Sequence, residues 1–502
     1  MKKIAALLLA LVLAFSLVAC GGEKDKKKDD GKEKEDKKDE KTEQSDESED
    51  KEMKVVLSDE QMNLPEDAKS IVGGGTFTIF APTPYGIEKF VSEAPNGTPL
   101  NDSIYYRNLK IQDELGVEIK AIDYAYYTHN QSEKIIDSVL NGDHGFDCAA
   151  IHSQSACAAL VIANAVLSFD LLEYCDLSKP WWNQGFRDAC ALNGEDFFAV
   201  SSACHGFYTS ASCILFNKSI AAEIGMEDPY ELVRKKQWTV DKLIQLTKNF
   251  SEDLNSDGMY DYNDKLAIIS NDWSHMNYFY GAFHQPTVLR NENNELEYNV
   301  NTQRMSTCLQ KLNDLFHTGR RGVIYDMYNP ENYTAAFAEG RVLFSVAGVG
   351  TATGLRDYDI SFGILPLPML DETQEEYGTW VDPWHLTLCV PIDSEKPERT
   401  GIILEALAYH SYYYVYPALI EQSIFGTGTR DVESLEMLTK YIYPNVFYDF
   451  GYIYDGYGKG YSDLIRKLIP DGSSDMSSFI QERKSIAENH FNSLYDAYMS
   501  NT

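Results

Sequence analysis

The chain has 502 residues, of which 12% are aromatic and 24% are charged, and its formal net charge at pH 7 is −33. Such acidity excludes binding to DNA, RNA or anionic lipid headgroups as the main role of the body. The length past residue 71 suffices for two domains or lobes, and no later apolar run approaches the ~20 residues of a transmembrane helix.

Residues 1–19 are predicted to be a secretory signal peptide, because two lysines precede an unbroken apolar run that ends in small residues. The sequence LVACGG resembles a bacterial lipoprotein signal, in which Cys20 is acylated. An ordinary export signal that happens to end in cysteine is the alternative. Each methylene of an acyl chain contributes about 0.8 kcal/mol when buried. We therefore expect a protein anchored by lipid to the extracellular face of the cell membrane.

Residues 20–70 are predicted to be a disordered tether. Residues 23–52 contain neither an aromatic nor an aliphatic side chain, so nothing there offsets the chain entropy lost on folding. Their charges alternate in sign, which argues against a nucleic-acid-binding arm.

The chain beyond the tether alternates strand-like and helix-like segments. GGTFTIFAP (74–82), VEIKAI (117–122) and FDCAAI (146–151) read as strands, and residues 102–115 and 132–141 read as helices. This rhythm predicts a largely parallel α/β sheet, whose ligand lies beyond the carboxyl ends of its strands. The candidate binding loops are 82–85 and 152–155.

Seven segments carry a resemblance to a known family: YYRNLKIQDELGVEI, FDCAAI…LLEYCDLSKPWWN, CILFNKSIAAEIG, QWTVDKLIQLTK, FAEGRVLFSVAG, ISFGILPLP and RDVESLEML. In this order they resemble the extracellular solute-binding lipoproteins of ABC importers, especially the carbohydrate type of Clostridia-like bacteria. The resemblance covers nearly all of the chain after the tether. It departs from the family pattern at the extra cysteines and at IFGTGT (424–429).

The resemblance implies a two-lobed, type II periplasmic-binding-protein-like α/β fold with hinge strands that cross between the lobes. Lobe 1 is then expected over 71–207 and 363–430, and lobe 2 over 208–362 and 431–502. The family function is to capture a solute and to deliver it to ABC permease subunits. The solute expected here is a carbohydrate, specifically an oligosaccharide, and a peptide or another polar solute is the alternative. The protein is expected to be a monomer that closes around its ligand, because the ligand contacts both lobes only in the closed state.

DLNSDGMYDYND (253–264) has the ligand spacing of an EF-hand calcium loop. The predicted ligands are Asp253, Asn255, Asp257, the Met259 carbonyl, Asp261 and Asp264. Position twelve is aspartate in place of the usual bidentate glutamate, and KLAIIS downstream reads as a strand. We therefore predict a structural calcium ion that fixes the loop; a metal-free acidic turn is the alternative.

Sugar sites combine aromatic rings with amides and charged groups that hydrogen-bond hydroxyls. The loops expected at the cleft offer ten candidates of this kind, although core packing is an equal alternative for any one of them. They are Tyr85, His152, Tyr208, Trp273, Asn277, Tyr278, Gly348, Thr351, Trp380 and Trp384. Trp273 and Trp384 are the strongest of the set, whereas Trp181 and Trp182 are expected to be packing residues.

The eight cysteines after Cys20 include no C-x-x-C pair, so zinc and dithiol redox sites have little support. Buried thiols are favoured over disulfides. The sequence also lacks G-x-S-x-G, HExxH and Walker motifs, so no catalytic residue is predicted. Two alternatives to transport remain: a carbohydrate-binding adhesion lipoprotein and, with less support, an exported glycosidase with paired carboxylates.

Overall fold

The computed structural model describes residues 57–500 apart from 84–85, 125–129, 292–294, 320–321, 356–357 and 421–430. The predicted signal peptide, Cys20, Tyr85 and the IFGTGT segment therefore lie outside the described residues.

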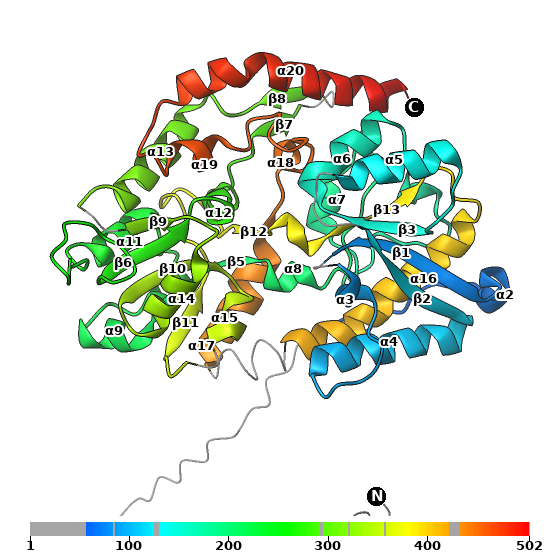
Figure 1. Ribbon diagram of the computed structural model, residues 1–502, viewed down its shortest axis with the longest axis horizontal. Coiled ribbons are helices and arrows are strands. Elements are labelled where there is room, and N and C mark those ends of the chain that lie inside the picture. The colour runs from blue at the N-terminus through cyan, green and yellow to red at the C-terminus, as the bar shows by residue number, and fades with distance from the viewer. Residues whose placement is uncertain are drawn as a thin grey trace, which may run out of the picture. The chain divides into compact units, whose positions relative to one another are not determined.

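The first sheet has the strand order β2-β1-β3-β13-β4. Strand β1 pairs in parallel with β2 and with the central strand β3, whereas β13 is antiparallel to β3 and β4. Helices α5 and α6 lie on one side of this sheet, and α4 and α16 lie on the other (Figure 1). Its strands are β1 (Gly75–Pro82), β2 (Val117–Tyr124), β3 (Cys148–Ile151), β4 (Val166–Leu167) and β13 (Thr387–Pro391). Its helices are α2 (Ala68–Val72), α3 (Ile87–Phe90), α4 (Pro99–Leu115), α5 (Gln131–Asn141), α6 (Ser153–Ile162), η2 (Phe169–Leu171), α7 (Gln184–Cys190) and α16 (Pro397–His410).

The early elements agree with those expected from sequence. Helix α4 begins with Pro99, whose fixed φ suits the first turn, and ends at Gly116, which adopts the left-handed φ of 73°. Strand β3 is buried along its whole length because helices cover both faces of the sheet.

The second sheet has the strand order β11-β5-β10-β6-β9, in which β10, β6 and β9 are parallel and β5 is antiparallel to both β10 and β11. Its strands are β5 (Ser212–Asn217), β6 (Leu266–Asn271), β9 (Gly322–Tyr325), β10 (Val342–Gly348) and β11 (Phe362–Leu365). The elements around it are α9 (Lys218–Glu223), α10 (Pro229–Arg234), α11 (Val240–Thr247), α12 (Ser274–Ala282), β7 (Val288–Arg290), β8 (Leu296–Tyr298), α13 (Gln303–Phe316), α14 (Pro330–Ala338), α15 (Thr351–Gly354) and α17 (Val432–Glu436).

Short segments connect the two sheets. Helix α8 (Gly206–Thr209) leads from the first sheet to β5, and β12 (Thr379–Trp380) with the turn η4 (Pro383–His385) leads back to β13. Strand β14 (Val446–Phe447) pairs in parallel with β12. Helix α12 packs directly on β12. Gly281 lies so close to the strand that an added Cβ atom would be only 2.7 Å from the Trp380 backbone nitrogen.

The remaining elements follow α16 along the chain. They are η5 (Ser411–Val415) and η7 (Met437–Ile442), both with π-helical turns, η8 (Tyr443–Asn445), α18 (Phe450–Ile453), α19 (Leu464–Leu468) and α20 (Met476–Ser500). Helix α20 packs against α6 beside the first sheet and against α19 beside the second (Figure 1).

Two expected boundaries differ from the structure. Strand β11 was assigned to lobe 1 from residue 363 on, but Gly363 pairs with Phe216 in the second sheet, and the chain returns to the first sheet only at β13. Sequence patterning identifies a strand but not which sheet edge it joins.

The tether was also expected to extend to residue 70. Instead, the Ser58 N–H donates to the Tyr412 hydroxyl at 3.3 Å, and the Ser58 carbonyl accepts from Tyr413 at 2.6 Å. Met62 and Leu64 pack against the core. These apolar side chains supply the burial that residues 23–52 lack, so the folded body begins earlier than expected.

All eight cysteines from Cys148 to Cys389 are free, and every one except the half-buried Cys175 is buried. This confirms the preference for buried thiols. Burial raises the pKa of these thiols, that of Cys204 to about 11. Among the described residues, no helix is both long and apolar enough to cross a bilayer.

Candidate functional site

A cavity of about 140 Å³ lies where the carboxyl ends of strands from both sheets meet. Gln154 comes from the first turn of α6, directly after β3, whereas Trp273 and Asn277 follow β6 on α12. Helices α19 and α20 close the cavity from the C-terminal part of the chain. We call it the basic cavity; its lining residues are Gln154, Trp273, Asn277, Tyr457, Gly458, Asp463, Arg466, Lys467 and Arg483.

Arg466 organises one wall of the basic cavity. Its guanidinium lies 3.5 Å from the centre of the Trp273 ring, and its Nε and Nη2 atoms hold the Asp463 carboxylate at 3.1 and 2.5 Å. One face of the indole is therefore covered by a cation, and a ligand would meet the guanidinium on that side.

Two buried polar atoms at this cavity have no hydrogen-bond partner among the described residues: Nη1 of Arg466 and Oδ1 of Asn277. The Arg466 side chain is 9% exposed and Asn277 is 4% exposed. A buried donor and a buried acceptor left unpaired each cost about 1–3 kcal/mol, so both atoms suit a ligand that supplies the missing partners.

Aromatic and acidic side chains also lie at the end of β3 and in the crossing segment around η4. The rings of His152 and Trp384 meet edge to face, with centroids 5.0 Å apart. The Asp382 carboxylate accepts the Trp384 N–H at 3.1 Å, and burial raises the pKa of this carboxyl to about 6. On the second-sheet side, the Tyr278 hydroxyl lies 3.7 Å from the position that a Cβ of Gly348 would occupy.

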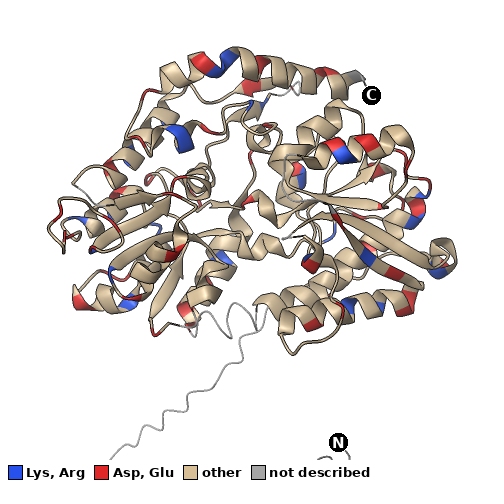
Figure 2. Ribbon diagram, in the orientation of Figure 1, with Lys and Arg blue, Asp and Glu red and all other residues tan. Residues whose placement is uncertain are grey.

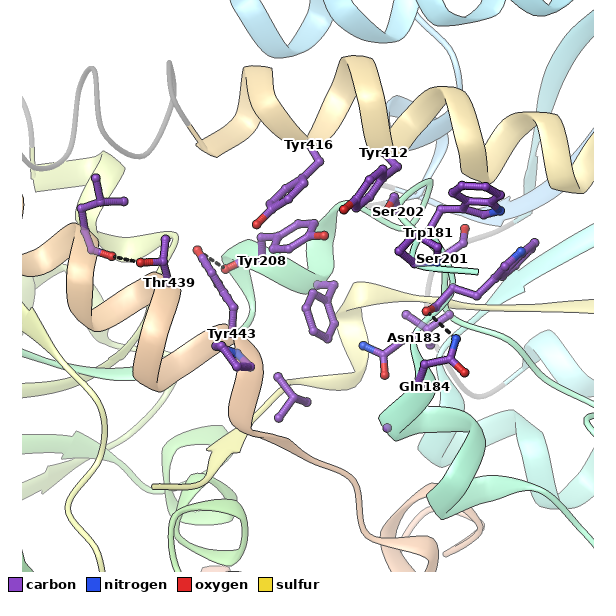
Figure 3. Close-up of a pocket in the computed structure, with 18 residues that line it drawn as sticks. Trp181, Asn183, Gln184, Ser201, Ser202, Tyr208, Tyr412, Tyr416, Thr439 and Tyr443 are labelled. Atoms are coloured by element: carbon purple, nitrogen blue, oxygen red, sulfur yellow. Dashed lines mark hydrogen bonds between the residues drawn. The ribbon is translucent and has the colours of Figure 1, made fainter. Parts of the chain in front are cut away.

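A second, larger cavity of about 600 Å³ lies between η5, η7 and α8, and none of its lining residues is charged (Figure 3). We call it the aromatic cavity. The Tyr208 ring stacks on Tyr416 at 4.2 Å and meets Tyr443 edge to face at 5.3 Å. The lining residues are Pro180, Trp181, Trp182, Asn183, Gln184, Gly185, Val200, Ser201, Ser202, Phe207, Tyr208, Tyr412, Tyr416, Leu435, Thr439, Tyr443, Pro444 and Val446.

Buried Glu405 fixes the two tryptophans of the aromatic cavity. The indole N–H groups of Trp181 and Trp182 donate to its two carboxylate oxygens at 3.0 and 2.8 Å. Burial nevertheless raises the pKa of Glu405 to about 7, because desolvation of the charge outweighs these hydrogen bonds. Both tryptophans are buried, as expected of packing residues, although they also face this cavity.

A Glu405→Gln variant is expected to show a weaker pH dependence of stability than the natural chain. Between about pH 4.5 and pH 7 the folded protein keeps a proton on Glu405 that the unfolded chain releases, so its contribution to the free energy of unfolding falls as pH rises, by about 1.4 kcal/mol per pH unit. Glutamine does not titrate. Urea unfolding at the two ends of this window measures the slope.

The control for this experiment is Glu133→Gln, a substitution of an exposed glutamate on α5. An unchanged slope in Glu405→Gln would contradict the account. The slope should shrink without vanishing, since burial also raises the pKa values of Asp382, Asp449 and Asp455.

The structure distributes most of the predicted binding residues over four places. Trp273 and Asn277 share the basic cavity, and His152 contacts Trp384. Tyr278 and Gly348 lie close together where α12 meets the end of β10. Tyr208 lines the aromatic cavity instead.

Thr351 is exposed at the start of α15. Trp380 is buried against Tyr452 at 4.6 Å and lines neither cavity, so it packs the crossing segment.

Sequence reasoning missed Gln154, although it lies in the predicted loop 152–155, and missed Arg466 and Arg483. Both arginines come from C-terminal helices that the βαβ rhythm does not place near the strand ends. Their positions on α19 and α20 carry no motif that singles them out.

The predicted calcium loop forms a compact turn ahead of β6, a strand as expected. Asp253 accepts the N–H groups of Ser256 and Gly258 at 2.6 and 2.9 Å, and buried Asp264 accepts that of Leu254 at 2.9 Å. Among the described residues, no three acidic, histidine or cysteine side chains gather closely enough to share a metal. The all-oxygen donor set suits calcium, but its carboxylates hold backbone N–H groups of the loop itself.

Comparison with known proteins identifies the fold. No protein-family model and no curated protein matches the sequence. Among solved structures, the galacto-N-biose/lacto-N-biose I-binding protein of a Bifidobacterium longum ABC transporter, in complex with lacto-N-biose, is similar with a TM-score of 0.57. It is 12% identical, and the match covers 84% of this chain and 98% of that one.

Two further solved structures show the same likeness. The ABC substrate-binding protein Lmo0181 of Listeria monocytogenes, in complex with cycloalternan, has a TM-score of 0.50 at 13% identity and covers 83% of this chain and 99% of its own. Apo RafE of Streptococcus pneumoniae has a TM-score of 0.52 at 15% identity, with 83% and 98% covered. The chain therefore has the two-lobed α/β fold of periplasmic sugar-binding proteins.

Proposed function

We propose that this protein is an extracellular solute-binding protein that captures a carbohydrate, specifically an oligosaccharide, in its basic cavity and delivers it to an ABC permease. The observation that carries the proposal is the convergence of Gln154, Trp273, Asn277 and Arg466 at the carboxyl ends of strands from both sheets. A ligand held there touches both halves of the molecule. Its binding energy therefore favours whichever arrangement of the lobes brings those halves together.

The proposed lipid anchor at Cys20 is inferred from the sequence alone. A lipid on Cys20 and the charged tether would keep the body outside the membrane while allowing it to reach a permease, and the protein would act as a monomer. A calcium ion in the loop 253–264 would be structural, since strand β6 and not a second helix follows that loop.

A thermal-shift screen of the purified chain against neutral and acidic oligosaccharides tests this function. A ligand at 100 times its dissociation constant adds about 2.7 kcal/mol to the free energy of unfolding. Trp273→Ala should lose most of that stabilisation, whereas Tyr106→Ala, which removes an exposed ring of α4, should keep it. Recovery of the sugar intact would support binding, and recovery of fragments would support a glycosidase instead.

A further inference from the structure

The basic cavity is positive although the chain carries a net charge of −33. Its lining contains three cations, Arg466, Lys467 and Arg483, and one acid, Asp463. Figure 2 shows basic residues on α19 and both basic and acidic residues on α20. Because Asp463 is held by Arg466, the other two cations have no acidic counterpart among the residues that line the cavity.

A second acid, Asp455, interacts with Asp463, but its carboxylate is hydrogen-bonded to backbone N–H groups. Asp455 is fully buried and accepts the N–H groups of Gly458 and Gly460, the latter at 2.8 Å. Burial and the neighbouring Asp463 raise its pKa to about 7, so it adds less than a full negative charge at neutral pH. Arg483 donates to the Gly458 carbonyl, an uncharged partner.

The unpaired buried atoms specify the chemistry of the missing partner. Nη1 of Arg466 needs an acceptor, and Oδ1 of Asn277 needs a donor. A carboxylate beside a hydroxyl supplies both, since the carboxylate accepts from the guanidinium and the hydroxyl donates to the amide oxygen. A sugar acid carries these two groups on one ring.

We propose that the basic cavity binds the carboxylate of a uronic acid residue, so that the captured carbohydrate is an acidic glycan. This inference rests on the proposed function and narrows its ligand class. The aromatic cavity differs from the basic cavity in charge. Tyrosine, tryptophan, amide and hydroxyl groups line it, and none of its lining residues is charged.

The test compares uronate disaccharides of gluco, galacto and manno configuration with the corresponding neutral disaccharides, by calorimetry on the full chain. At least one uronate should bind about tenfold or more tightly than its neutral counterpart, and added salt should weaken this preference. Arg466→Gln should reduce the preference about 10- to 100-fold.

Because Arg466 is buried against Asp463, a second variant keeps the test independent of folding. Lys467→Gln changes an exposed side chain and should reduce the uronate preference about 2- to 5-fold. Lys484→Gln on α20 makes the same change in net charge away from the cavity and should leave the preference unchanged. An equal effect of both lysine substitutions would overturn the proposal.

The outcomes separate this inference from the proposed function. Neutral disaccharides that bind as tightly as their uronates would overturn the acidic preference and leave carbohydrate capture intact. If no disaccharide of either kind bound, both proposals would fall together.

Discussion

Replacing Asp449 by alanine is expected to lower the free energy of unfolding by about 3 to 5 kcal/mol. This buried carboxylate joins α18 to the segment before β7: it accepts the Thr287 N–H at 3.1 Å, the Thr287 hydroxyl at 2.7 Å and the Gly451 N–H at 3.0 Å. Alanine would leave these donors buried without an acceptor. Urea unfolding at neutral pH measures the loss.

Asp449→Asn is the matched control. Its amide oxygen can still accept from the two backbone N–H groups, and the Thr287 hydroxyl can accept from its NH2 group, so we expect a loss of only about 1 kcal/mol. If the alanine variant were as stable as the asparagine variant, the buried donors would not be the source of the cost.

Removal of calcium is expected to have the second largest effect on stability. If the loop 253–264 binds the ion, calcium at 100 times its dissociation constant adds about 2.7 kcal/mol to the free energy of unfolding, and a chelator removes it. Asp257→Asn should abolish most of this difference, since it keeps the side-chain acceptor for the Met259 N–H while losing the carboxylate charge. Differential scanning calorimetry with calcium and with chelator measures the shift.

The control for the calcium experiment is Asp371→Asn, because Asp371 forms a similar turn by accepting the Thr373 N–H at 2.9 Å. Identical melting temperatures with calcium and with chelator would show that calcium does not stabilise the fold. The loop would then be an acidic turn held by side-chain acceptors such as Asp253, Asp257 and Asp264.

The early helices and strands of the first sheet were predicted well, because each is defined by residues within its own short segment. Periodicity and a terminal glycine define α4, and continuous apolar residues define β3. The edge that β11 joins depends on contacts between residues that lie far apart in sequence, which no pattern records. The start of the folded body was misplaced for the same reason, since Ser58 contacts Tyr412 and Tyr413, more than 350 residues away.

The candidate site was predictable in part. Trp273 and Asn277 follow a recognisable strand, and the rule that ligands lie at the carboxyl ends of strands brings them to one cavity. Arg466 belongs to a five-residue helix near the C-terminus and reaches the cavity only through tertiary packing. Trp380 shows the converse, since an aromatic residue in a crossing segment packs as readily as it binds.

Helix α20 changes the mechanics of this fold. The chain crosses between the sheets at α8 and at β12, with β14 paired beside β12. These crossings lie next to one another, since Ala211 after α8 bridges to Val381 after β12. Helix α20 adds a separate tie by packing on α6 at the first sheet and on α19 at the second. A rotation of the lobes that keeps the α20 contacts is therefore more restricted than a rotation about the crossing segments alone. A rotation that moves α6 away from α20 has to break this contact.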